Sequence, residues 1–303
     1  MKIYNKIKEC RICKNRNLKI IIDLKSQYIQ GSFIKKNYPK PYSKKIPLKL
    51  VFCKKCFLVQ LLHTTNKEIL YKNYWYSSGI NQTMKTHLKK LANLICAIKR
   101  KETKNIDVLD IGCNDGTLLN YFPKSVNKYG IDPSQIIKRI DKKKITVIHD
   151  FFPPKKNLRS LKIKFDLITS IAMFYDINDP NLFVKNIKYY LKNKGIWVFE
   201  LSYLVDMLKL NSFDTICHEH LEYYSLQTLN YLMKKNGLKI FNLSRNSING
   251  GSIRCFVTHE KNSIYDKKQN IYKIKKLIKN EKKLKINSLY PYKKFYKNIL
   301  KIK

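Results

Sequence analysis

The sequence predicts an α/β protein with a doubly wound, Rossmann-like parallel sheet, helices on both faces of that sheet, and a small cysteine-bearing module at its N-terminal side. Three observations predict this fold. Short apolar runs typical of buried strands alternate with helical patterns through the middle of the chain. Several of these runs end at an acidic residue, and two Cys-x-x-Cys pairs precede the first of them.

Five apolar runs account for the parallel part of the sheet. They are the start of VLDIGCNDGTLL (residues 108–119), Val126–Ile131, Ile145–Ile148, Phe165–Ile171 and Gly195–Phe199. Helical patterns lie between them, as in Asn181–Leu191, where apolar residues recur at helical spacing. Two later apolar segments, 238–243 and 252–259, flank an Asn-Gly turn. Such a turn predicts a hairpin, here one that closes the sheet.

The first run ends in an acidic, glycine-rich turn. Gly112 and Gly116 permit positive φ and a close approach of the backbone to a ligand. Asp110 and Asp115 would repel a phosphate, and the turn is neither G-x-G-x-x-G nor followed by G-K-[ST]. The turn therefore suits a ligand with a cationic or polyhydroxyl end. S-adenosylmethionine fits, because its sulfonium and amino groups are positive and its ribose offers hydroxyls.

Acidic residues also follow the neighbouring runs. Asp132 comes about 20 residues after the turn and is placed to accept both hydroxyls of a ribose. After the third run, Asp150 is placed to accept an adenine amino group, and Phe151 to cover the base. The fourth run carries Asp166, and the fifth ends in Glu200. An ordinary polar strand end explains each residue alone, but the set along one edge predicts a ligand site.

The charge of the chain invites a nucleic-acid hypothesis, which the pattern of charge does not favour. The formal net charge is +41, but seven of the 62 basic residues are Arg, and the Lys are scattered through every segment. A binding surface for nucleic acid would be clustered and richer in Arg. The sequence has no apolar run near 18 residues and no secretory leader, so we expect a cytoplasmic protein without a membrane span.

Two cysteine pairs mark the N-terminal module. Cys10 and Cys13, with Cys53 and Cys56, form C-x2-C-x39-C-x2-C, which offers four thiolates to a structural zinc ion. Redox cysteines and ordinary buried thiols are the alternatives. A second pair flanking a small basic segment favours zinc, and four ligands leave no open position for chemistry. The other four cysteines are expected to be packing residues.

A polar segment and an aromatic segment carry the remaining candidates for chemistry. Residues 214–225 read DTICHEHLEYYS, in which the two His alternate, so that one can face a pocket while the other packs. The alternative for this segment is a satisfied polar strand or loop. The aromatic residues Tyr74, Trp75 and Tyr76 precede an expected helix at 82–97, and could equally be a hydrophobic staple between domains.

The chain resembles the sugar C-methyltransferase family, whose members methylate carbon in nucleotide-linked 4-keto-6-deoxyhexoses. The resemblance rests on residues 53–61 (CKKCFLVQL), 74–78, the IGCNDGTLL turn, the segment from Glu219 to Ser225, and 250–254 (GGSIR), and it covers nearly the whole chain. It implies a class I methyltransferase sheet. It also implies roles for particular residues: zinc at Cys10, Cys13, Cys53 and Cys56; S-adenosylmethionine at Asp110, Gly112, Asn114 and Asp132; and the sugar at Tyr76, Glu219, His220 and Tyr223.

Two departures from the family pattern matter. Asp176 stands where the family usually carries a His after the fourth strand, so Asp176 is an alternative to His220 as the base. Family members also generally continue into a further α/β domain. Here a Lys-rich helical stretch (265–285) is followed by 292–303, which looks like the opening helix of that domain. We therefore expect a shortened C-terminal region, or a compact subfamily with another acceptor.

These observations predict four regions: a zinc-binding module (1–68), a helical connector (69–105), a methyltransferase domain (106–260) and a Lys-rich helical extension (261–303). The predicted activity is methylation of a keto sugar through an enolate, with His220 as the base and Tyr76 or Tyr223 as a donor to the enolate oxygen. An O- or N-methyltransferase of another small molecule is the first alternative, and a basic nucleic-acid-binding methyltransferase or adaptor the second. A chain that binds S-adenosylmethionine without catalysis is a third. We expect a small-molecule partner, no specific nucleic acid, and a monomer or homodimer.

Overall fold

The computed structural model describes residues 3–30, 45–71, 74, 76–103, 105–154 and 163–302. Trp75 of the aromatic segment and Lys303 of the predicted C-terminal helix lie outside the described residues, as does part of the predicted zinc-binding module.

A seven-stranded sheet forms the centre of the described chain, with the order β12-β13-β10-β9-β6-β7-β8. Its strands are β6 (Ile106–Ile111), β7 (Val126–Ile131), β8 (Thr146–Ile148), β9 (Phe165–Ile171), β10 (Leu191–Ser202), β12 (Leu238–Asn246) and β13 (Ser252–His259). β6 to β10 run parallel, while β13 pairs antiparallel with both β10 and β12. The predicted parallel sheet with its closing hairpin is confirmed, and β13 of that hairpin lies between β10 and β12.

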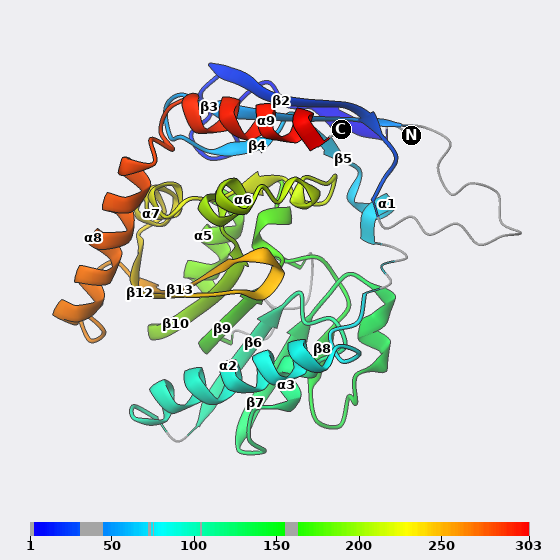
Figure 1. Cartoon of the computed structure of the whole chain (residues 1–303). Helices are drawn as coiled ribbons and strands as arrows, with labels where there is room; N and C mark the ends of the chain where they lie inside the picture. Colours follow the sequence, from blue (N-terminus) through cyan, green and yellow to red (C-terminus); the bar gives the residue numbers. More distant parts are fainter. Residues whose placement is uncertain are drawn as a thin grey trace, which may run out of the picture.

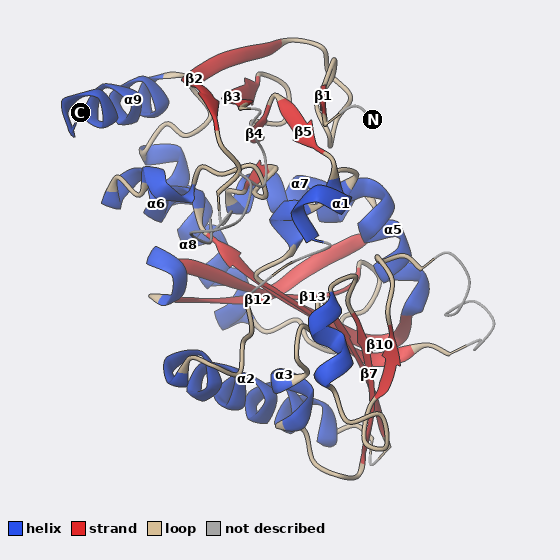
Figure 2. Cartoon of the chain, turned by 90° about the vertical axis from the view of Figure 1, so that its right-hand side faces the viewer, coloured by secondary structure: helices blue, strands red, loops and turns tan. Residues whose placement is uncertain are grey.

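Helices cover both faces of this sheet (Figure 2). They are α2 (Gln82–Arg100) and α3 (Thr117–Asn120) on one face, and α5 (Pro180–Tyr190) and α7 (Leu226–Lys235) on the other. Alternate residues of β10 serve the two layers, as a strand requires: Ile196 and Val198 pack with α2, whereas Trp197 and Phe199 pack with α5 and α7. Both faces of the strand are therefore buried from Gly195 to Phe199, which explains the apolar run over these residues.

The N-terminal module is a four-stranded antiparallel sheet in the order β11-β4-β3-β2, beside a two-stranded ribbon. The sheet consists of β2 (Leu18–Gln27), β3 (Ile46–Cys53), β4 (Val59–Leu61) and β11 (Glu222–Tyr223); the ribbon pairs β1 (Tyr4–Lys6) with β5 (His63–Thr65). The short helix α1 (Lys67–Tyr71) follows β5. β11 lies much later in the sequence than the other strands of this sheet and pairs with β4. A segment that follows the central parallel strands therefore completes the module.

The C-terminal segment forms two helices, as the sequence predicts: α8 (Lys268–Lys283) and α9 (Tyr290–Ile302). α8 packs on α7 and β12, and α9 packs on β2 of the N-terminal sheet (Figure 1). The buried Glu281 of α8 accepts hydrogen bonds from the backbone N–H of Leu226 (2.6 Å) and Gln227 (3.0 Å) at the start of α7. This segment is thus part of the same folded body. That it opens a further domain stays a prediction.

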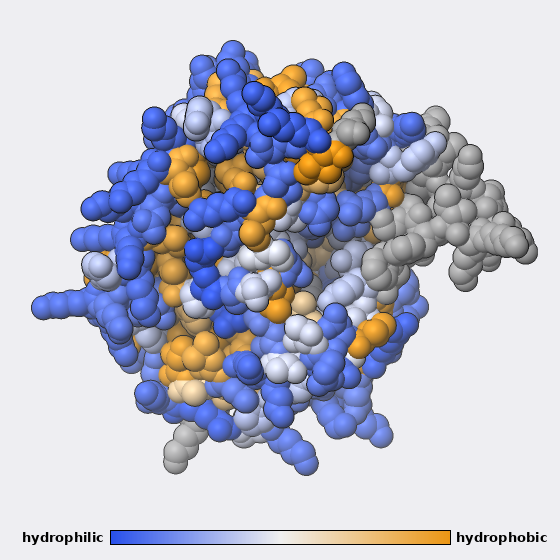
Figure 3. All heavy atoms as spheres, in the orientation of Figure 1, coloured by the Kyte–Doolittle hydropathy of each residue, from blue (hydrophilic) through white to orange (hydrophobic). Residues whose placement is uncertain are grey.

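The helix α6 (Leu204–Leu210) follows β10, and short 3-10 turns occur at η1 (Gln135–Arg139), η2 (Phe174–Asp176), η3 (Phe213–Thr215) and η4 (Ile248–Gly250). The face drawn in Figure 3 is mostly hydrophilic with separate apolar patches. In the described part of the chain, every helix is too short or too polar to cross a membrane.

Candidate active site

A cavity of about 790 Å³ lies at the carboxyl ends of the parallel strands and extends to the N-terminal module. Residues that follow β6, β7 and β8 line one end, among them Gly112, Asp132 and Asp150. Thr64, Thr65 and Lys67 of the N-terminal module line it as well. The cavity therefore brings the sheet edge and the module into one site, where parallel α/β sheets bind their ligands.

The glycine-rich turn after β6 has the backbone that its sequence requires. Gly112 and Gly116 have φ of 73° and 75°, in the left-handed region that glycine adopts without strain. The backbone N–H of Gly112 donates to the carbonyl of Ile131 (2.8 Å), which ties the turn to β7. A Cβ on Gly112 would lie 3.0 Å from Cγ of Met173, so the turn packs closely against the Met173 side chain.

Asp110 and Asp132 both line the cavity, but their surroundings differ. Asp110 is buried and accepts a hydrogen bond from the Thr169 hydroxyl (2.6 Å); burial, reinforced by the nearby charge of Asp132, raises its pKa to about 7. Asp132 accepts from the N–H of Asn114 (2.9 Å) and from the N–H (2.8 Å) and hydroxyl (2.5 Å) of Ser134. Three donors fix the orientation of the Asp132 carboxylate, which keeps lone pairs for a ligand.

Asp150 and Phe151 line the same end of the cavity. Asp150 Oδ1 accepts from the N–H of Phe151 (2.7 Å). The ammonium of Lys67 lies 3.7 Å from the centroid of the Phe151 ring, a cation–π contact. Phe151 thus lines the cavity with one face of its ring against Lys67, and its contact with an adenine stays a prediction. The sequence analysis gave no role to Lys67.

Asn114 and Asp115 hold the aromatic segment above the turn. The Asn114 side chain accepts from the N–H of Ser78 (2.9 Å) and donates to the carbonyl of Tyr76 (2.9 Å). Asp115 Oδ2 accepts from the Ser77 hydroxyl (2.5 Å) and the Gly79 N–H (2.7 Å). Tyr76, which is half-buried, is positioned by this clamp and lines the cavity.

Two of the predicted ligand residues lie behind the cavity wall. Asp115 and Gly116 are not among the residues that line the cavity, and their contact with a ligand stays a prediction. Asp115 points at the 77–79 segment, where a Cβ on Gly79 would come within 2.8 Å of its Oδ2. Gly116 lies behind the turn against Ile140 and begins α3.

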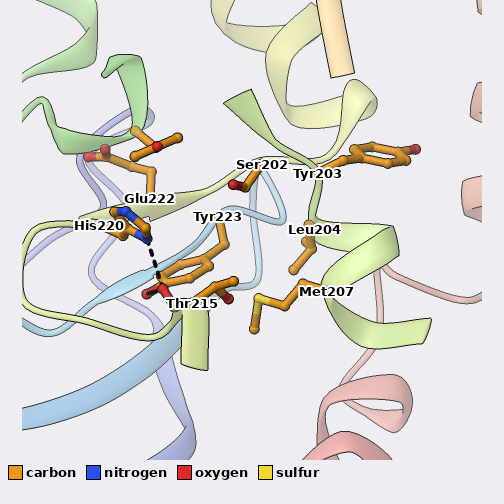
Figure 4. A pocket seen from close by; sticks show the side chains of 9 residues that line it. Ser202, Tyr203, Leu204, Met207, Thr215, His220, Glu222 and Tyr223 are labelled. Atoms are coloured by element: carbon orange, nitrogen blue, oxygen red, sulfur yellow. Dashed lines mark hydrogen bonds between the residues drawn. The ribbon is translucent and has the colours of Figure 1, made fainter. Parts of the chain in front are cut away.

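His220 lies at the other end of the cavity with a defined tautomer. Its Nδ1 is 2.8 Å from the carbonyl oxygen of Thr215 (Figure 4). A carbonyl only accepts, so Nδ1 carries the proton and Nε2 is left with a lone pair that can accept one. The Tyr175 ring packs edge-on against the imidazole at 4.4 Å. His218 is buried and bonded to the carbonyl of Ile46 (3.1 Å), so one His faces the cavity and the other packs, as their alternation predicts.

Tyr223 is close to this site without lining the main cavity. It borders a small adjoining void of about 10 Å³, together with His220 and Ser202 (Figure 4). Its hydroxyl donates to the same Thr215 carbonyl that binds His220 (3.3 Å). In this structure Tyr223 helps to hold the loop that orients His220, and its contact with the substrate stays a prediction.

Two carboxyl groups stand beside His220. Asp176 and Glu219 both line the cavity. Burial raises the pKa of Asp176 well above its usual range, against the opposing effect of His220. Burial also raises the pKa of Glu219.

Glu200 and Asp166, the other acidic residues of the sheet, serve structure instead. Glu200 is paired with Arg254 (2.7 Å) and His87 (2.6 Å), and Asp166 lies at the start of β9 with Lys192 (2.7 Å). Of the acidic residues predicted at the sheet edge, Asp110, Asp132 and Asp150 line the cavity.

The four cysteines of the two pairs come together as predicted. Their sulfurs all lie within 4.8 Å of one another, with Cys10 to Cys56 at 3.5 Å and Cys13 to Cys53 at 3.4 Å. These distances exceed a disulfide bond and are close to the roughly 3.8 Å between sulfurs that tetrahedral zinc coordination would give. The two pairs also share a backbone form, since Lys14 and Phe57 each follow a pair with positive φ and donate to the carbonyl of its first cysteine. The donor set fits a structural zinc ion.

Arg11, between the cysteines of the first pair, connects this cluster to the rest of the site. It is 3% exposed, and its guanidinium donates to the Leu61 carbonyl (2.6 Å) and the Thr64 hydroxyl (2.8 Å). Its Nε lies 3.5 Å from a carboxylate oxygen of Glu222 on β11. The sequence analysis missed this pair. The chain has only seven Arg, and one of them lies between the two cysteines of the first pair, which was the sequence signal for this contact.

Three family models match consecutive parts of the chain. A model described as "Putative zinc binding domain" matches residues 10–71, one described as "Methyltransferase domain" matches 81–243, and one described as "C-methyltransferase C-terminal domain" matches 247–303. Among curated proteins, the chain is 26% identical over 258 residues to the C-methyltransferase NovU of Streptomyces niveus, which covers 84% of this chain and 61% of that protein. The chain therefore spans about three fifths of the length of this relative.

Solved structures of methyltransferases resemble part of the chain at low identity. One is an S-adenosylmethionine-dependent methyltransferase from Clostridium acetobutylicum, with a TM-score of 0.46 and 14% identity, covering 57% of this chain and 91% of that one. Another is the magnesium protoporphyrin IX methyltransferase from Synechocystis with bound SAH, with a TM-score of 0.46 and 12% identity, covering 59% of this chain and 88% of that one.

Proposed function

Because the chain belongs to the methyltransferase family whose model matches residues 81–243, and is similar on either side of it to a zinc-binding domain and to a C-methyltransferase C-terminal domain, we propose that it transfers a methyl group from S-adenosylmethionine to carbon. The proposed acceptor is a nucleotide-linked 4-keto-6-deoxy sugar. One observation carries the proposal. A single cavity has carboxylates suited to a cationic, ribose-bearing ligand at one end, and a histidine with a proton-accepting Nε2 at the other.

At the cofactor end, the residues present suit S-adenosylmethionine. When bound, this cofactor supplies a methyl group on a positively charged sulfur. Asp132 is oriented to accept hydroxyl protons, as a ribose would require. Asp110 lies close by, where its carboxylate would attract an ammonium group. Asp150 and Phe151 border the same end, where an adenine would find an acceptor and a ring.

At the acceptor end, the chemistry starts from the keto group, which acidifies the neighbouring C–H bond. His220 Nε2 takes that proton, and the electron pair of the C–H bond moves to form the enolate. The Thr215 carbonyl, which accepts from Nδ1, stabilises the imidazolium that results. The Tyr175 ring, which packs edge-on against the imidazole, keeps it in one orientation. The enolate carbon is then the nucleophile.

The names of the C-terminal family model and of the relative from Streptomyces support carbon, rather than oxygen or nitrogen, as the methylated atom. The sugar, its nucleotide, a cytoplasmic location, and a monomeric or homodimeric state stay predictions.

The proposal is tested by hydrogen exchange. With a nucleotide-linked 4-keto-6-deoxyhexose in deuterated water, the protein is expected to exchange the proton next to the keto group without a methyl donor, because enolisation precedes transfer. His220→Asn keeps an amide N–H that can donate to the Thr215 carbonyl but removes the base, and should slow exchange by roughly 10²–10⁴-fold. Methyl transfer to an acceptor that shows no exchange would contradict carbon methylation and favour an O- or N-methyltransferase.

Cofactor binding is tested separately by calorimetry with S-adenosylmethionine. Asp132→Ala should weaken binding by about 1.5–3 kcal/mol, the usual contribution of a hydrogen bond to a charged group. His220→Asn should leave this affinity unchanged. No binding by the zinc-loaded wild-type protein would contradict the cofactor assignment.

A further inference from the structure

Asp176 is a partly buried acid that the mechanism above does not use. It ends the 3-10 turn η2 directly after β9, and its backbone N–H donates to the carbonyl of Met173 (3.0 Å). Asp176 lines the same end of the cavity as His220 and Glu219. Its position is thus fixed by the sheet edge, where the family resemblance led us to expect a histidine.

The surroundings of Asp176 disfavour a negative charge. Its Oδ1 is fully buried and has no hydrogen-bond partner among the described residues. A carboxylate in such a place loses the hydration of that oxygen, and the interaction of the carboxyl group with the Tyr71 hydroxyl compensates for this only in part. The other oxygen, Oδ2, is the one left to meet a ligand.

The titratable groups that face Asp176 act mostly in the same direction. They are Cys217 and Glu219 of the loop before β11, Glu222 of β11, Tyr71 of α1, the neighbouring Tyr74 and Tyr175, and His220. Of these, His220 and the Tyr71 hydroxyl, which interacts with the carboxyl group, favour the ionised form of Asp176, while Cys217, Glu219 and Glu222 oppose it. Burial is the largest effect and raises the pKa of Asp176 well above its usual range. These surroundings favour the protonated form of the Asp176 carboxyl group.

A protonated carboxyl group cannot act as a base, but it can donate. The acceptor end needs a donor at the oxygen where negative charge develops. Lys67 is the one lysine or arginine among the described residues that line the cavity, and its ammonium lies on the Phe151 ring at the cofactor end. A neutral acid at Asp176 fills the need without adding a second negative charge.

We propose that Asp176 is a neutral carboxylic acid that donates a hydrogen bond to the carbonyl oxygen of the acceptor, while His220 removes the neighbouring proton. This inference rests on the proposed function. As the C–H bond breaks, its electron pair becomes the C=C bond of the enolate and the carbonyl pair moves to oxygen. The proton goes to His220 Nε2. Asp176 keeps its own proton and donates it in a hydrogen bond to the enolate oxygen. Protonated carboxylic acids in apolar enzyme sites stabilise enolates in this way.

Two substitutions separate a donor from a base. Asp176→Asn keeps the shape and, through its amide N–H, a donor, so exchange of the keto-sugar proton should stay within about tenfold of wild type. Asp176→Leu keeps the volume and removes the donor, and should slow exchange by roughly 10²–10³-fold. Both variants should bind S-adenosylmethionine like wild type in calorimetry, which shows that the fold and the cofactor end are intact.

The pH profile gives a readout that a purely structural role would not change. A donor acid is active below its pKa and is lost as pH rises through it, so exchange by wild type should fall on the alkaline side. Asp176→Asn should not show that fall, because an amide does not titrate. Loss of exchange in Asp176→Asn, while wild type exchanges, would make Asp176 the base and overturn this role, leaving the proposed function standing. No exchange by wild type on any keto sugar would overturn the proposed function and this role together.

Discussion

The pair of Arg11 and Glu222 gives the sharpest test of how the N-terminal module and the catalytic half depend on each other. Arg11→Met removes the guanidinium but keeps a side chain of similar length. Glu222 would then keep a carboxylate whose side chain is 0% exposed, and neither of its oxygens has a hydrogen-bond partner among the described residues. Removing one partner of a buried ion pair costs about 3–5 kcal/mol. We expect a loss of stability of that size, measured by urea unfolding at pH 8.

The sign of the pH dependence follows from Glu222. Burial raises the pKa of this carboxyl well above its usual range, and the charge of Arg11 opposes that rise, so without Arg11 the pKa rises further. A raised carboxyl pKa lowers stability as pH rises from the unfolded pKa, about 4.3, toward the folded one. The cost of Arg11→Met should therefore be largest at pH 8 and shrink toward pH 5, where Glu222 can stay protonated in the folded protein.

A double variant and a surface variant complete the experiment. Arg11→Met with Glu222→Leu removes both charges and should recover most of the lost stability, since apolar replacement of a buried pair is often neutral. Lys14 directly follows the same cysteine pair, but its side chain is 53% exposed and is paired with Glu9. Lys14→Ala should therefore lower the free energy of unfolding by less than about 1 kcal/mol. If Arg11→Met is as stable as wild type at pH 8, or if the double variant is no better than the single one, the account of this pair is refuted.

Three further predictions concern the cofactor end, the metal and the clamp. Burial raises the pKa of Asp110 to about 7, so the affinity for S-adenosylmethionine, measured by calorimetry, should fall by up to about tenfold per pH unit below 7. Asp110→Asn should bind the cofactor weakly, with an affinity that is nearly independent of pH. Elemental analysis should find one zinc per chain, and Cys53→Ser should lose it and expose the N-terminal module to protease; full zinc occupancy in that variant would contradict the site. Asp115→Ala should weaken cofactor binding by releasing the 77–79 segment, although Asp115 is not on the cavity wall, and unchanged affinity would mean that the segment holds itself in place.

The central sheet could be predicted because both faces of its strands are buried. Such strands have the near-continuous apolar runs that the sequence shows, as in Phe165–Ile171. The closing hairpin could be predicted from its Asn-Gly turn. Asp132 and Asp150 could be located at the cavity because strand ends of a parallel sheet meet at one edge.

The contacts made by loops could not be predicted in this way. Asp110 and Asp115 flank one turn, yet the first lines the cavity and the second points away to Gly79. Spacing along a turn does not fix the direction of a side chain. The two-residue strand β11 carries no periodic signal, so neither its pairing with β4 nor the contact of Glu222 with Arg11 was foreseeable.

The composite N-terminal sheet sets the order in which the chain can complete its fold during synthesis. The four cysteines are made early, but β11 and the apolar residues of α9 that cover the sheet, such as Tyr292 and Phe295, come much later. At ribosomal rates of 5–20 residues per second, the interval between Cys56 and Tyr292 is roughly 10–50 s. For that time the sheet lacks an edge strand and its cover, and a metal ion on the cysteines is what can hold it together. Grafting residues 1–68 onto another enzyme would make that incomplete state permanent.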